Sequence, residues 1–238
     1  DVILGGMIMA VYILADIHGM YDKFMRMLDK INMTDEDILY VLGDMVDRGP
    51  HPIKVVQKIM NMKNVRTLIG NHDSGVIGTL KFFAMNDSYS GDTSTEREFQ
   101  TLDQQEKMNV IEFLSELPYY YDISVNDQQY ILVHGGLGNF SPGKSLDEYT
   151  IDEIVWTRPD FSVPYYTDRI VVCGHTPTQL IEENDRPGYI MKKNNYIAID
   201  CGACFRCGRL AAICLDTGRS SMSKLDVKNC CKWCKGNV

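Results

Sequence analysis

The chain has 238 residues, of which 45% are hydrophobic and 24% charged, enough for one large α/β domain or two small ones. Its formal net charge of −8 argues against a general nucleic-acid-binding protein, because such proteins normally carry a basic face. The apolar stretch at residues 2–15 is shorter than a membrane-spanning helix requires and runs directly into Asp16. We therefore expect neither nucleic acid nor membrane as a partner.

The N-terminal residues set an expectation about the cellular compartment. We interpret Met7 as the native start and residues 1–6 as a remnant of cloning. Because we identify no signal peptide, the expected compartment is the cytoplasm. In that compartment the eight cysteines are expected to be reduced thiols or metal ligands rather than disulfides.

Three units of similar design open the chain. Apolar, β-rich runs at residues 9–14, 37–42 and 65–69 predict three strands. Between them, apolar residues recur at helical spacing from Tyr21 onwards and again at residues 53–60. This alternation of strands and helices is typical of a parallel sheet with helices on its faces.

The strand signal stops at residue 74 and returns near residue 119. Residues 86–98 are polar and are expected to be flexible, whereas residues 103–117 have the pattern of an amphipathic helix, so we predict a helical cap over about 74–115. Strands are then predicted at residues 119–125, 129–133, 169–173, 196–200 and 209–215, the first two joined by a hairpin turn. We expect one domain over residues 7–217 and a loose, cysteine-containing tail over 218–238.

The strong polar motifs each follow a predicted strand. They are ADIHG (15–19), GDMVDRGP (43–50), GNHD (70–73), VHGG (133–136) and CGHTP (173–177). The carboxyl ends of parallel strands are where ligands bind in α/β sheets. Of the five histidines only His51 lies outside the core of these motifs, and we interpret it as a solvated loop residue. One such motif alone is more often a capped turn, but five in this context favour a functional site.

The donor atoms in these motifs indicate a metal site. Carboxylate oxygens, an amide oxygen and imidazoles occur together without thiolates, a mixture that suits Mn, Fe or Zn in a catalytic site. The candidate ligands are Asp16, His18, Asp44, Asn71, His134 and His175. Six ligands exceed what one open catalytic ion needs, whereas two ions that share a bridging carboxylate would use them all.

The ordered series of motifs resembles the phosphoprotein phosphatase family of calcineurin-like metallophosphoesterases. That family has GDxHG, GDxVDRG, GNHE, HGG and a late histidine, and the match spans about residues 9–217. It is most similar to the compact bacterial and lambda phosphatase type, in which the late histidine lies in GHT. The resemblance implies a four-layer αββα sandwich with two metal ions at the strand ends.

The resemblance also implies a role for each matching residue. Asp16 and His18 would hold the first metal ion, and Asp44 would bridge it to the second. The second ion would be completed by Asn71, His134 and His175. His72 matches the general acid and Asp47 the residue that orients it, while Arg48 and Arg158 match the arginines that grip phosphate. The implied reaction is in-line attack on phosphorus by a water that the two ions activate.

Two departures from the family pattern bear on the substrate. Ala15 replaces the first glycine of GDxHG, and Asp73 replaces the glutamate of GNHE. The sequence GNHD also occurs in symmetrical dinucleoside tetraphosphate hydrolases, which typically carry alanine where this chain has Asp47. We therefore predict a phosphomonoesterase, specifically a serine/threonine protein phosphatase that acts on phosphorylated protein or a small phosphoester, with the tetraphosphate hydrolase as the alternative.

A third interpretation is a catalytically inactive scaffold with the same fold. It predicts eroded metal ligands, and none of the six candidates is missing. The native metal pair, for which manganese is the first expectation, and the oligomeric state stay open.

The cysteines carry a separate hypothesis. The pairs Cys204 with Cys207 and Cys231 with Cys234 have the C-x-x-C spacing of a zinc ribbon, although the gap between the pairs is long. The alternative is that they are ordinary thiols, since cysteine is among the commonest core residues. Cys173 and Cys214 lie inside predicted strands and are expected in the core.

Overall fold

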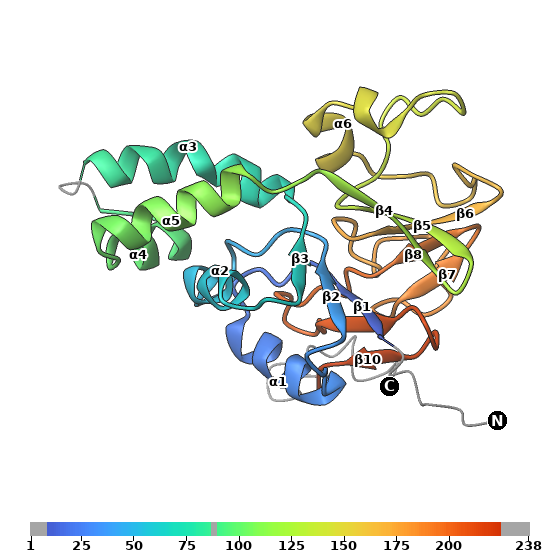
Figure 1. Ribbon diagram of the computed structural model, residues 1–238, viewed down its shortest axis with the longest axis horizontal. Coiled ribbons are helices and arrows are strands. Elements are labelled where there is room, and N and C mark those ends of the chain that lie inside the picture. The colour runs from blue at the N-terminus through green and yellow to red at the C-terminus, as the bar shows by residue number, and fades with distance from the viewer. Residues whose placement is uncertain (1–8, 87–89, 225–238) are drawn as a thin grey trace, which may run out of the picture.

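Two five-stranded sheets form the centre of the protein, as Figure 1 shows for the computed structural model, which describes residues 9–86 and 90–224. The first sheet has the strand order β10–β9–β1–β2–β3 and the second the order β4–β5–β6–β8–β7. The strands of the first sheet are β1 (Val11–Leu14), β2 (Ile38–Val41), β3 (Val65–Thr67), β9 (Ala211–Cys214) and β10 (Ser220–Met222). Those of the second are β4 (Tyr120–Val125), β5 (Gln128–Val133), β6 (Arg169–Cys173), β7 (Met191–Lys193) and β8 (Tyr196–Ala198).

The first sheet begins with the three predicted strands. β1 pairs with β2 and β2 with β3, both in parallel, so their carboxyl ends lie at the same edge. β9 and β10 extend this sheet in the antiparallel sense, and Met222 pairs with Ala211. The expectation of a loose tail directly after residue 217 was therefore wrong, because residues 220–222 form an edge strand.

The second sheet begins with the predicted hairpin. β4 and β5 are antiparallel, and the two residues between them, Asn126 and Asp127, have φ angles of 50° and 61°. A two-residue turn with both φ angles positive matches the twist of the strands that it joins. β5, β6 and β8 are parallel, so a second set of carboxyl ends lies at one edge.

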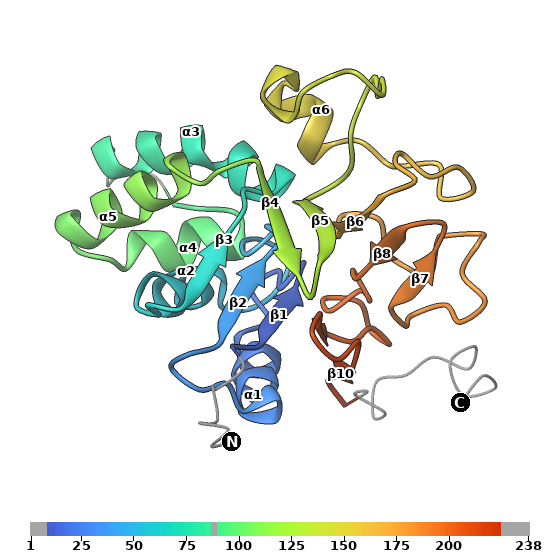
Figure 2. The same ribbon diagram turned by 45° about the vertical axis from the view of Figure 1, so that its right-hand side comes forward.

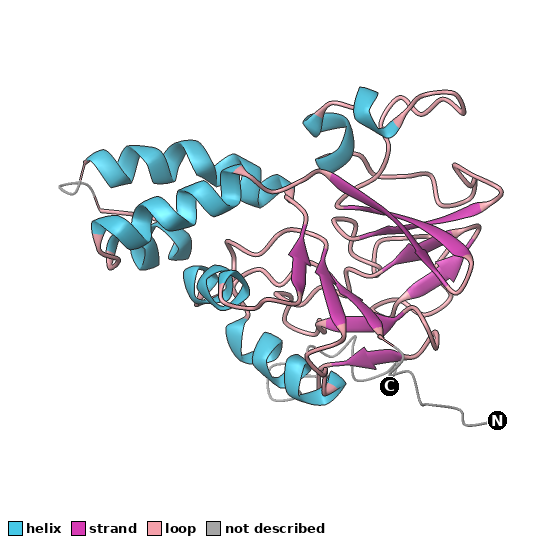
Figure 3. Ribbon diagram, in the orientation of Figure 1, coloured by secondary structure: helices cyan, strands magenta, loops and turns pink. Residues whose placement is uncertain are grey.

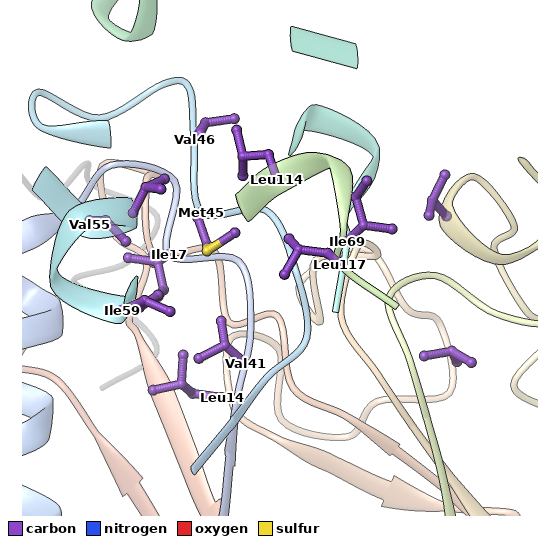
Figure 4. Close-up of a cluster of buried hydrophobic side chains, with 14 of the residues drawn as sticks. Leu14, Ile17, Val41, Met45, Val46, Val55, Ile59, Ile69, Leu114 and Leu117 are labelled. Atoms are coloured by element: carbon purple, nitrogen blue, oxygen red, sulfur yellow. The ribbon is translucent and has the colours of Figure 1, made fainter. Parts of the chain in front are cut away.

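The two sheets pack face to face around a shared apolar core. Val11 and Ile13 of β1 lie in this core with Leu132 of β5 and Val172 of β6. Leu14, on the other face of β1, lies in a different cluster with Val41 and residues of the helices, because successive side chains of a strand point to opposite faces (Figure 4). Cys173 and Cys214 are both buried, as predicted.

Helices cover the outer face of the first sheet (Figure 3). α1 (Tyr21–Ile31) and α2 (Pro52–Met60) follow the first two strands and bury one apolar side each. Leu14 and Val41 of the sheet lie beside Val55 and Ile59 of α2 in Figure 4. These helices match the predicted alternation, and the two-sheet α/β architecture is confirmed.

A second helical group projects to one side of the sheets in Figures 1 and 2. It contains α3 (Asn71–Met85), α4 (Ser94–Gln100) and α5 (Gln104–Ser115). α4 overlaps the stretch expected to be flexible, and for residues 94–98 that expectation was wrong. The Thr93 hydroxyl accepts from the Glu96 amide at 3.1 Å and the Glu96 carboxylate accepts from the Thr93 amide at 3.0 Å. This reciprocal capping box starts the helix, and the fully buried Phe99 anchors it.

The outer face of the second sheet is covered by short elements. They are η1 (Leu146–Glu148), α6 (Ile151–Val155) and the loop that follows, in which Phe161 stacks edge-on against Tyr196 of β8 with ring centroids 5.2 Å apart. Within the described ranges, no helix combines the length and apolar character needed to cross a membrane.

Asp37 ties the starts of β1 and β2 together, and its replacement tests this junction. Its buried carboxylate accepts from the Ala10 amide at 2.8 Å and from the Thr34 amide at 2.7 Å. Burial alone would raise the pKa of Asp37, but these hydrogen bonds outweigh it and the pKa lies below its ordinary value. Asp37→Asn should lower the free energy of unfolding by about 1.5–3 kcal/mol at neutral pH, the range for hydrogen bonds to a charged group.

The sign of the pH dependence follows from the lowered pKa. The Asp37 carboxylate adds stability above its unfolded pKa, and this contribution is lost as the pH falls through the folded pKa. The difference between wild type and Asp37→Asn in urea unfolding should therefore shrink in acid. The exposed neighbour Asp35 offers the matched control, Asp35→Asn. A constant difference at all pH values, or an equal effect of the control, would contradict the assignment.

Candidate active site

Polar residues from six strand ends converge between the two sheets. The residues that follow β1, β2, β3, β5, β6 and β8 at this edge are Asp16, Asp44, Asn71, His134, His175 and Asp200. A cavity of about 570 Å³ opens above them, and it is lined by eight of the ten residues predicted for the site. The other two, Asp16 and His134, are buried, with 1% and 0% exposed.

The backbone around the site is strained at many positions. Six of the predicted site residues have positive φ angles, a conformation uncommon outside glycine: Asp16, His18, Asp44, Asp47, Arg48 and His175. The carboxylates approach the backbone so closely that two motif glycines are required. A Cβ on Gly70 would lie 2.2 Å from Asp44 Oδ1, and one on Gly174 would lie 2.1 Å from Asp16 Oδ2. The glycines of GNHD and CGHTP therefore make room for the carboxylates.

The Asp44 carboxylate lies between two histidines, one on each of its oxygens. Oδ2 is 3.4 Å from His18 Nε2, and Oδ1 is 3.4 Å from His134 Nε2. Asp44 is also the member shared by the two groups of side chains whose ligand atoms lie within 4.8 Å of one another. These groups are His18, Asp44 and His72, and Asp44, His134 and His175. A carboxylate that belongs to two ligand groups is suited to bridge two cations.

The protonation of the histidines tests whether these residues fit a metal ion. His134 Nδ1 lies 2.7 Å from the Leu42 carbonyl oxygen and must carry the proton there, so Nε2 presents a lone pair. That lone pair faces Asn71 Oδ1 at 2.9 Å and Asp44 Oδ1 at 3.4 Å. Burial lowers the pKa of His134 to about 4, so the ring is neutral at neutral pH. Lone pairs that converge without a proton between them fit a cation.

His18 is arranged in the same way on the other side of Asp44. Its Nδ1 is 3.0 Å from the Val46 carbonyl oxygen, which leaves the Nε2 lone pair directed at Asp44. Burial lowers the pKa of His18 to about 3. A backbone carbonyl that holds Nδ1–H fixes the ring orientation, as is usual for metal-binding histidines.

Buried negative charge is concentrated around the same point. Burial raises the pKa of Asp44 and that of Asp200 to about 6 each. Burial also raises the pKa of Asp16, and the charges of Asp200 and Asp44 raise it further. Buried carboxylates of this density require compensating positive charge, which divalent cations would supply.

Asp16 and His175 are joined through the backbone. The His175 amide donates to both oxygens of Asp16, at 3.2 and 3.1 Å. Burial lowers the pKa of His175 to about 3, and its ring lies 5.1 Å from that of His134. Asp16 belongs to neither of the two close groups around Asp44. Asp16 lies next to these groups, and its role as a metal ligand stays a prediction.

His72 and Asp47 form a hydrogen-bonded pair on the cavity wall. His72 Nδ1 is 2.8 Å from Asp47 Oδ2, and this bond raises the pKa of His72, although burial lowers it in part. Arg48 Nη2 donates to the opposite ring nitrogen, Nε2, at 3.0 Å. The ring is therefore held between the carboxylate that fixes its Nδ1–H and a guanidinium that occupies its Nε2.

The cavity lining also includes Arg158 and large apolar side chains. Arg158 Nη1 donates to the His175 carbonyl oxygen at 3.2 Å. The apolar lining residues Trp156, Leu180 and Phe205 are 57%, 69% and 37% exposed. Large apolar side chains that are open to solvent within a charged cavity suggest a contact surface for the non-phosphate part of a substrate.

Asp73, the residue that departs from GNHE, supports the loop after β2. Its carboxylate accepts from the Gly70 amide at 3.0 Å and from the Met45 and Val46 amides at 3.0 and 3.3 Å. It is fully buried and does not line the cavity. The aspartate that replaces the family's glutamate therefore affects how the loop with Asp44 is held. It is not placed to contact a substrate in the cavity.

Two features of the site were missed by sequence reasoning. Asp200 lines the cavity and could have been found, because it follows the apolar run of β8 as the other site residues follow their strands. The sequence assigned Cys204 to a hypothetical zinc ribbon. In the structure its thiol lies beside Arg48. Burial raises the pKa of this thiol, and Arg48 offsets that rise in part. Cys231 and Cys234 lie outside the described residues, so the zinc hypothesis stays a prediction.

Comparison with known proteins identifies the family to which these features belong. Residues 9–202 match the calcineurin-like phosphoesterase family. The asymmetrical bis(5'-nucleosyl)-tetraphosphatase PrpE of Halalkalibacterium halodurans is 28% identical in an alignment 229 positions long, which covers 84% of this chain and 88% of the relative. Serine/threonine-protein phosphatase 2 of Salmonella typhimurium is 24% identical over 156 residues, 62% of this chain and 67% of the relative.

A shorter sequence match and a structural match add to this comparison. The symmetrical bis(5'-nucleosyl)-tetraphosphatase of Buchnera aphidicola is 41% identical over only 71 residues, 29% of this chain and 26% of that protein. The crystal structure of a candidate diadenosine tetraphosphatase has a TM-score of 0.66 at 20% identity and covers 93% of this chain and 96% of that one. Proteins named for different substrates thus match this one chain.

Replacement of Asp44 tests the shared carboxylate. Asp44→Asn should remove the charge that both ligand groups share, so we expect manganese content after reconstitution to fall from two ions per chain to one or none. Elemental analysis of dialysed protein measures this. Asp47→Asn, on the same loop but outside both ligand groups, is the control and should keep both ions. An Asp44→Asn protein that still bound two ions would rule out the bridging role.

Proposed function

The chain belongs to the calcineurin-like phosphoesterase family, and we propose that it hydrolyses phosphomonoesters, with phosphoserine and phosphothreonine peptides as substrates. The observation that carries this proposal is the pair of His72 Nδ1 and Asp47 Oδ2, 2.8 Å apart on the cavity wall. An alkoxide is a poor leaving group and needs a proton as the P–O bond breaks. A histidine held by a carboxylate within the cavity is placed to give that proton.

The six candidate ligands would hold two divalent cations. Asp16 and His18 would bind one ion and Asn71, His134 and His175 the other, with Asp44 shared between them. Manganese is our first choice, with iron or zinc as alternatives, because the donors are nitrogen and oxygen without thiolate. When bound, the ions supply Lewis acidity, which neutralises phosphoryl charge and lowers the pKa of the attacking water.

The arginines would bind the phosphoryl group. Arg48 and Arg158 line the same cavity, and a planar guanidinium suits a bidentate grip on phosphate oxygens. Without substrate, Arg48 donates to His72 Nε2 at 3.0 Å. When Arg48 turns to the phosphate, it releases Nε2. Nε2 can then take up a proton from solvent and give it to the leaving oxygen, while Asp47 keeps hold of Nδ1–H.

A second candidate activity is hydrolysis of dinucleoside polyphosphates. The exposed apolar surface of Trp156, Leu180 and Phe205 favours it, because aromatic side chains stack with nucleobases. One relative named as a bis(5'-nucleosyl)-tetraphosphatase also matches 84% of the chain. The leaving group in the hydrolysis of a dinucleoside polyphosphate is a phosphate, which is far more stable than an alkoxide. The dependence of the reaction on His72 and Asp47 therefore separates the two activities.

Replacement of His72 tests acid catalysis. His72→Asn should retain the metal ions and lower kcat on alkyl phosphates by about 10²–10⁴, the usual contribution of a general acid. The loss should be much smaller for p-nitrophenyl phosphate, whose leaving group hardly needs a proton. Steady-state kinetics of manganese-loaded enzyme on both substrates provide the comparison. Equal losses on both would assign His72 another role.

Replacement of Asp47 tests the substrate class. Wild-type enzyme should have a higher kcat/KM for phosphoserine or phosphothreonine peptides than for diadenosine tetraphosphate. Asp47→Ala should slow the peptide reaction much more than the cleavage of the anhydride, because the carboxylate stabilises and orients the proton-donating imidazole. The proposal fails if the wild type prefers diadenosine tetraphosphate, or if Asp47→Ala slows both reactions equally.

A further inference from the structure

Thr95 of α4 makes two hydrogen bonds to Asp47 through one hydroxyl group. Its Oγ1 donates to Asp47 Oδ1 at 2.6 Å and accepts from the Asp47 amide at 3.0 Å. Thr95 is 0% exposed, so neither bond is shared with bulk water. The other oxygen of Asp47, Oδ2, is the one that accepts from His72. The two carboxylate oxygens of Asp47 therefore serve two different partners.

Asp47 needs such a support because its backbone is in a disfavoured conformation. Its φ angle is 65° and that of Arg48 is 64°, so two consecutive residues without glycine's freedom are left-handed. This conformation is unfavourable for an L-residue, so surrounding contacts must offset its cost. The bond from the Asp47 amide to Thr95 holds the backbone at this point, and the bond to Oδ1 fixes the side chain.

α4 is itself fastened to the same loop by a second contact. The Glu98 carboxylate binds His51 Nδ1 at 3.0 Å and accepts from the Ile53 amide at 2.7 Å, at the start of α2. His51 is thus paired rather than simply solvated, contrary to expectation. Together Thr95 and Glu98 place one helix of the cap along residues 47–53. The N-terminal turn of α4 also lines the cavity through Thr93 and Glu96.

We infer that Thr95 is a positioning residue for acid catalysis, which it supports by holding the Asp47 carboxylate in the orientation that fixes His72. This inference rests on the proposed phosphomonoesterase activity. Thr95 does not line the cavity, and both hydrogen bonds of its hydroxyl described above go to Asp47. Its effect passes through Asp47 alone. The cap would therefore contribute to the chemistry as well as to the wall of the cavity.

Thr95→Val removes the hydroxyl and keeps the shape of the side chain. We expect kcat on a phosphoserine peptide to fall by about tenfold, a part of the 10²–10⁴ that a general acid contributes. The loss on p-nitrophenyl phosphate should be clearly smaller. Thr95→Ser restores the hydroxyl and should recover the peptide rate. Thr101→Val, at the end of the same helix, is the matched control, because its hydroxyl donates to the Glu98 carbonyl oxygen and not to Asp47 in the described structure. This variant should keep the wild-type ratio of the two rates.

A double variant separates positioning from general destabilisation. If Thr95 acts through Asp47, Thr95→Val in the Asp47→Ala background should cause no further loss in the ratio of peptide to p-nitrophenyl phosphate rates. A structural defect in the cap would add its own loss. Thermal melts of each variant establish that the compared proteins are folded at the assay temperature.

A measurement without metal or substrate completes the test. In metal-free protein labelled with ¹⁵N-histidine, the His72 Nδ1–H resonance should be visible in wild type and Thr95→Ser and lost through exchange with water in Thr95→Val. The inference is overturned if this resonance persists in Thr95→Val, if both substrates lose equally, or if the double variant loses more than Asp47→Ala. Should the wild type not hydrolyse phosphomonoesters, the proposed function fails, whereas the NMR comparison still decides whether Thr95 holds the pair.

Discussion

The buried carboxylate of Asp44 is the group on which the rest of the site depends. Each of its oxygens lies 3.4 Å from the free ring nitrogen of a different histidine, His18 on one side and His134 on the other. The first histidine follows β1 and the second follows β5, so the two stacked sheets must bring their strand ends to the same place. A carboxylate in this position is costly without cations. The fold is therefore arranged around a buried charge that bound cations would compensate.

Three residues of the short loop after β2 have different roles in the site. Asp44 faces the two ligand groups, Asp47 holds His72, and Arg48 reaches the cavity. Such a loop cannot be held by regular strand or helix bonds, since all three of these residues are left-handed. Side chains from the helices hold the loop instead. Asp73 of α3 accepts from amides near the start of the loop, and Thr95 of α4 accepts from an amide in its middle. Strain at the site is thus offset by hydrogen bonds from outside it.

Strand ends were the part of the structure that the sequence made predictable. Strands with continuous apolar runs, such as β1 and β6, leave a strong signal, and the polar residue that follows each strand marks the site. The same rule, applied to the run before Asp200, would have added that residue. β10 was not expected, because its three residues have too little apolar content to signal an edge strand.

The supports of the site were harder to predict, because they depend on contacts between distant parts of the chain. α4 could have been recognised from the capping box at Thr93, but its polar surroundings resemble a flexible loop. Nothing in the local sequence shows that Thr95 meets Asp47, 48 residues earlier. In the same way, the effect of Asp73 on the Met45 amide appears only when β2 and α3 are packed together. Such contacts form only in the folded chain, so the residues that make them leave no periodic pattern in the sequence.

The most direct test of this account is anomalous diffraction at the manganese edge from crystals of metal-loaded wild-type protein. The account predicts two peaks roughly 3.5–4 Å apart, the usual separation in dimetal sites. One should lie next to each oxygen of Asp44, between that oxygen and the Nε2 atom of His18 or His134. A single peak, or two peaks of which neither contacts Asp44, would contradict it.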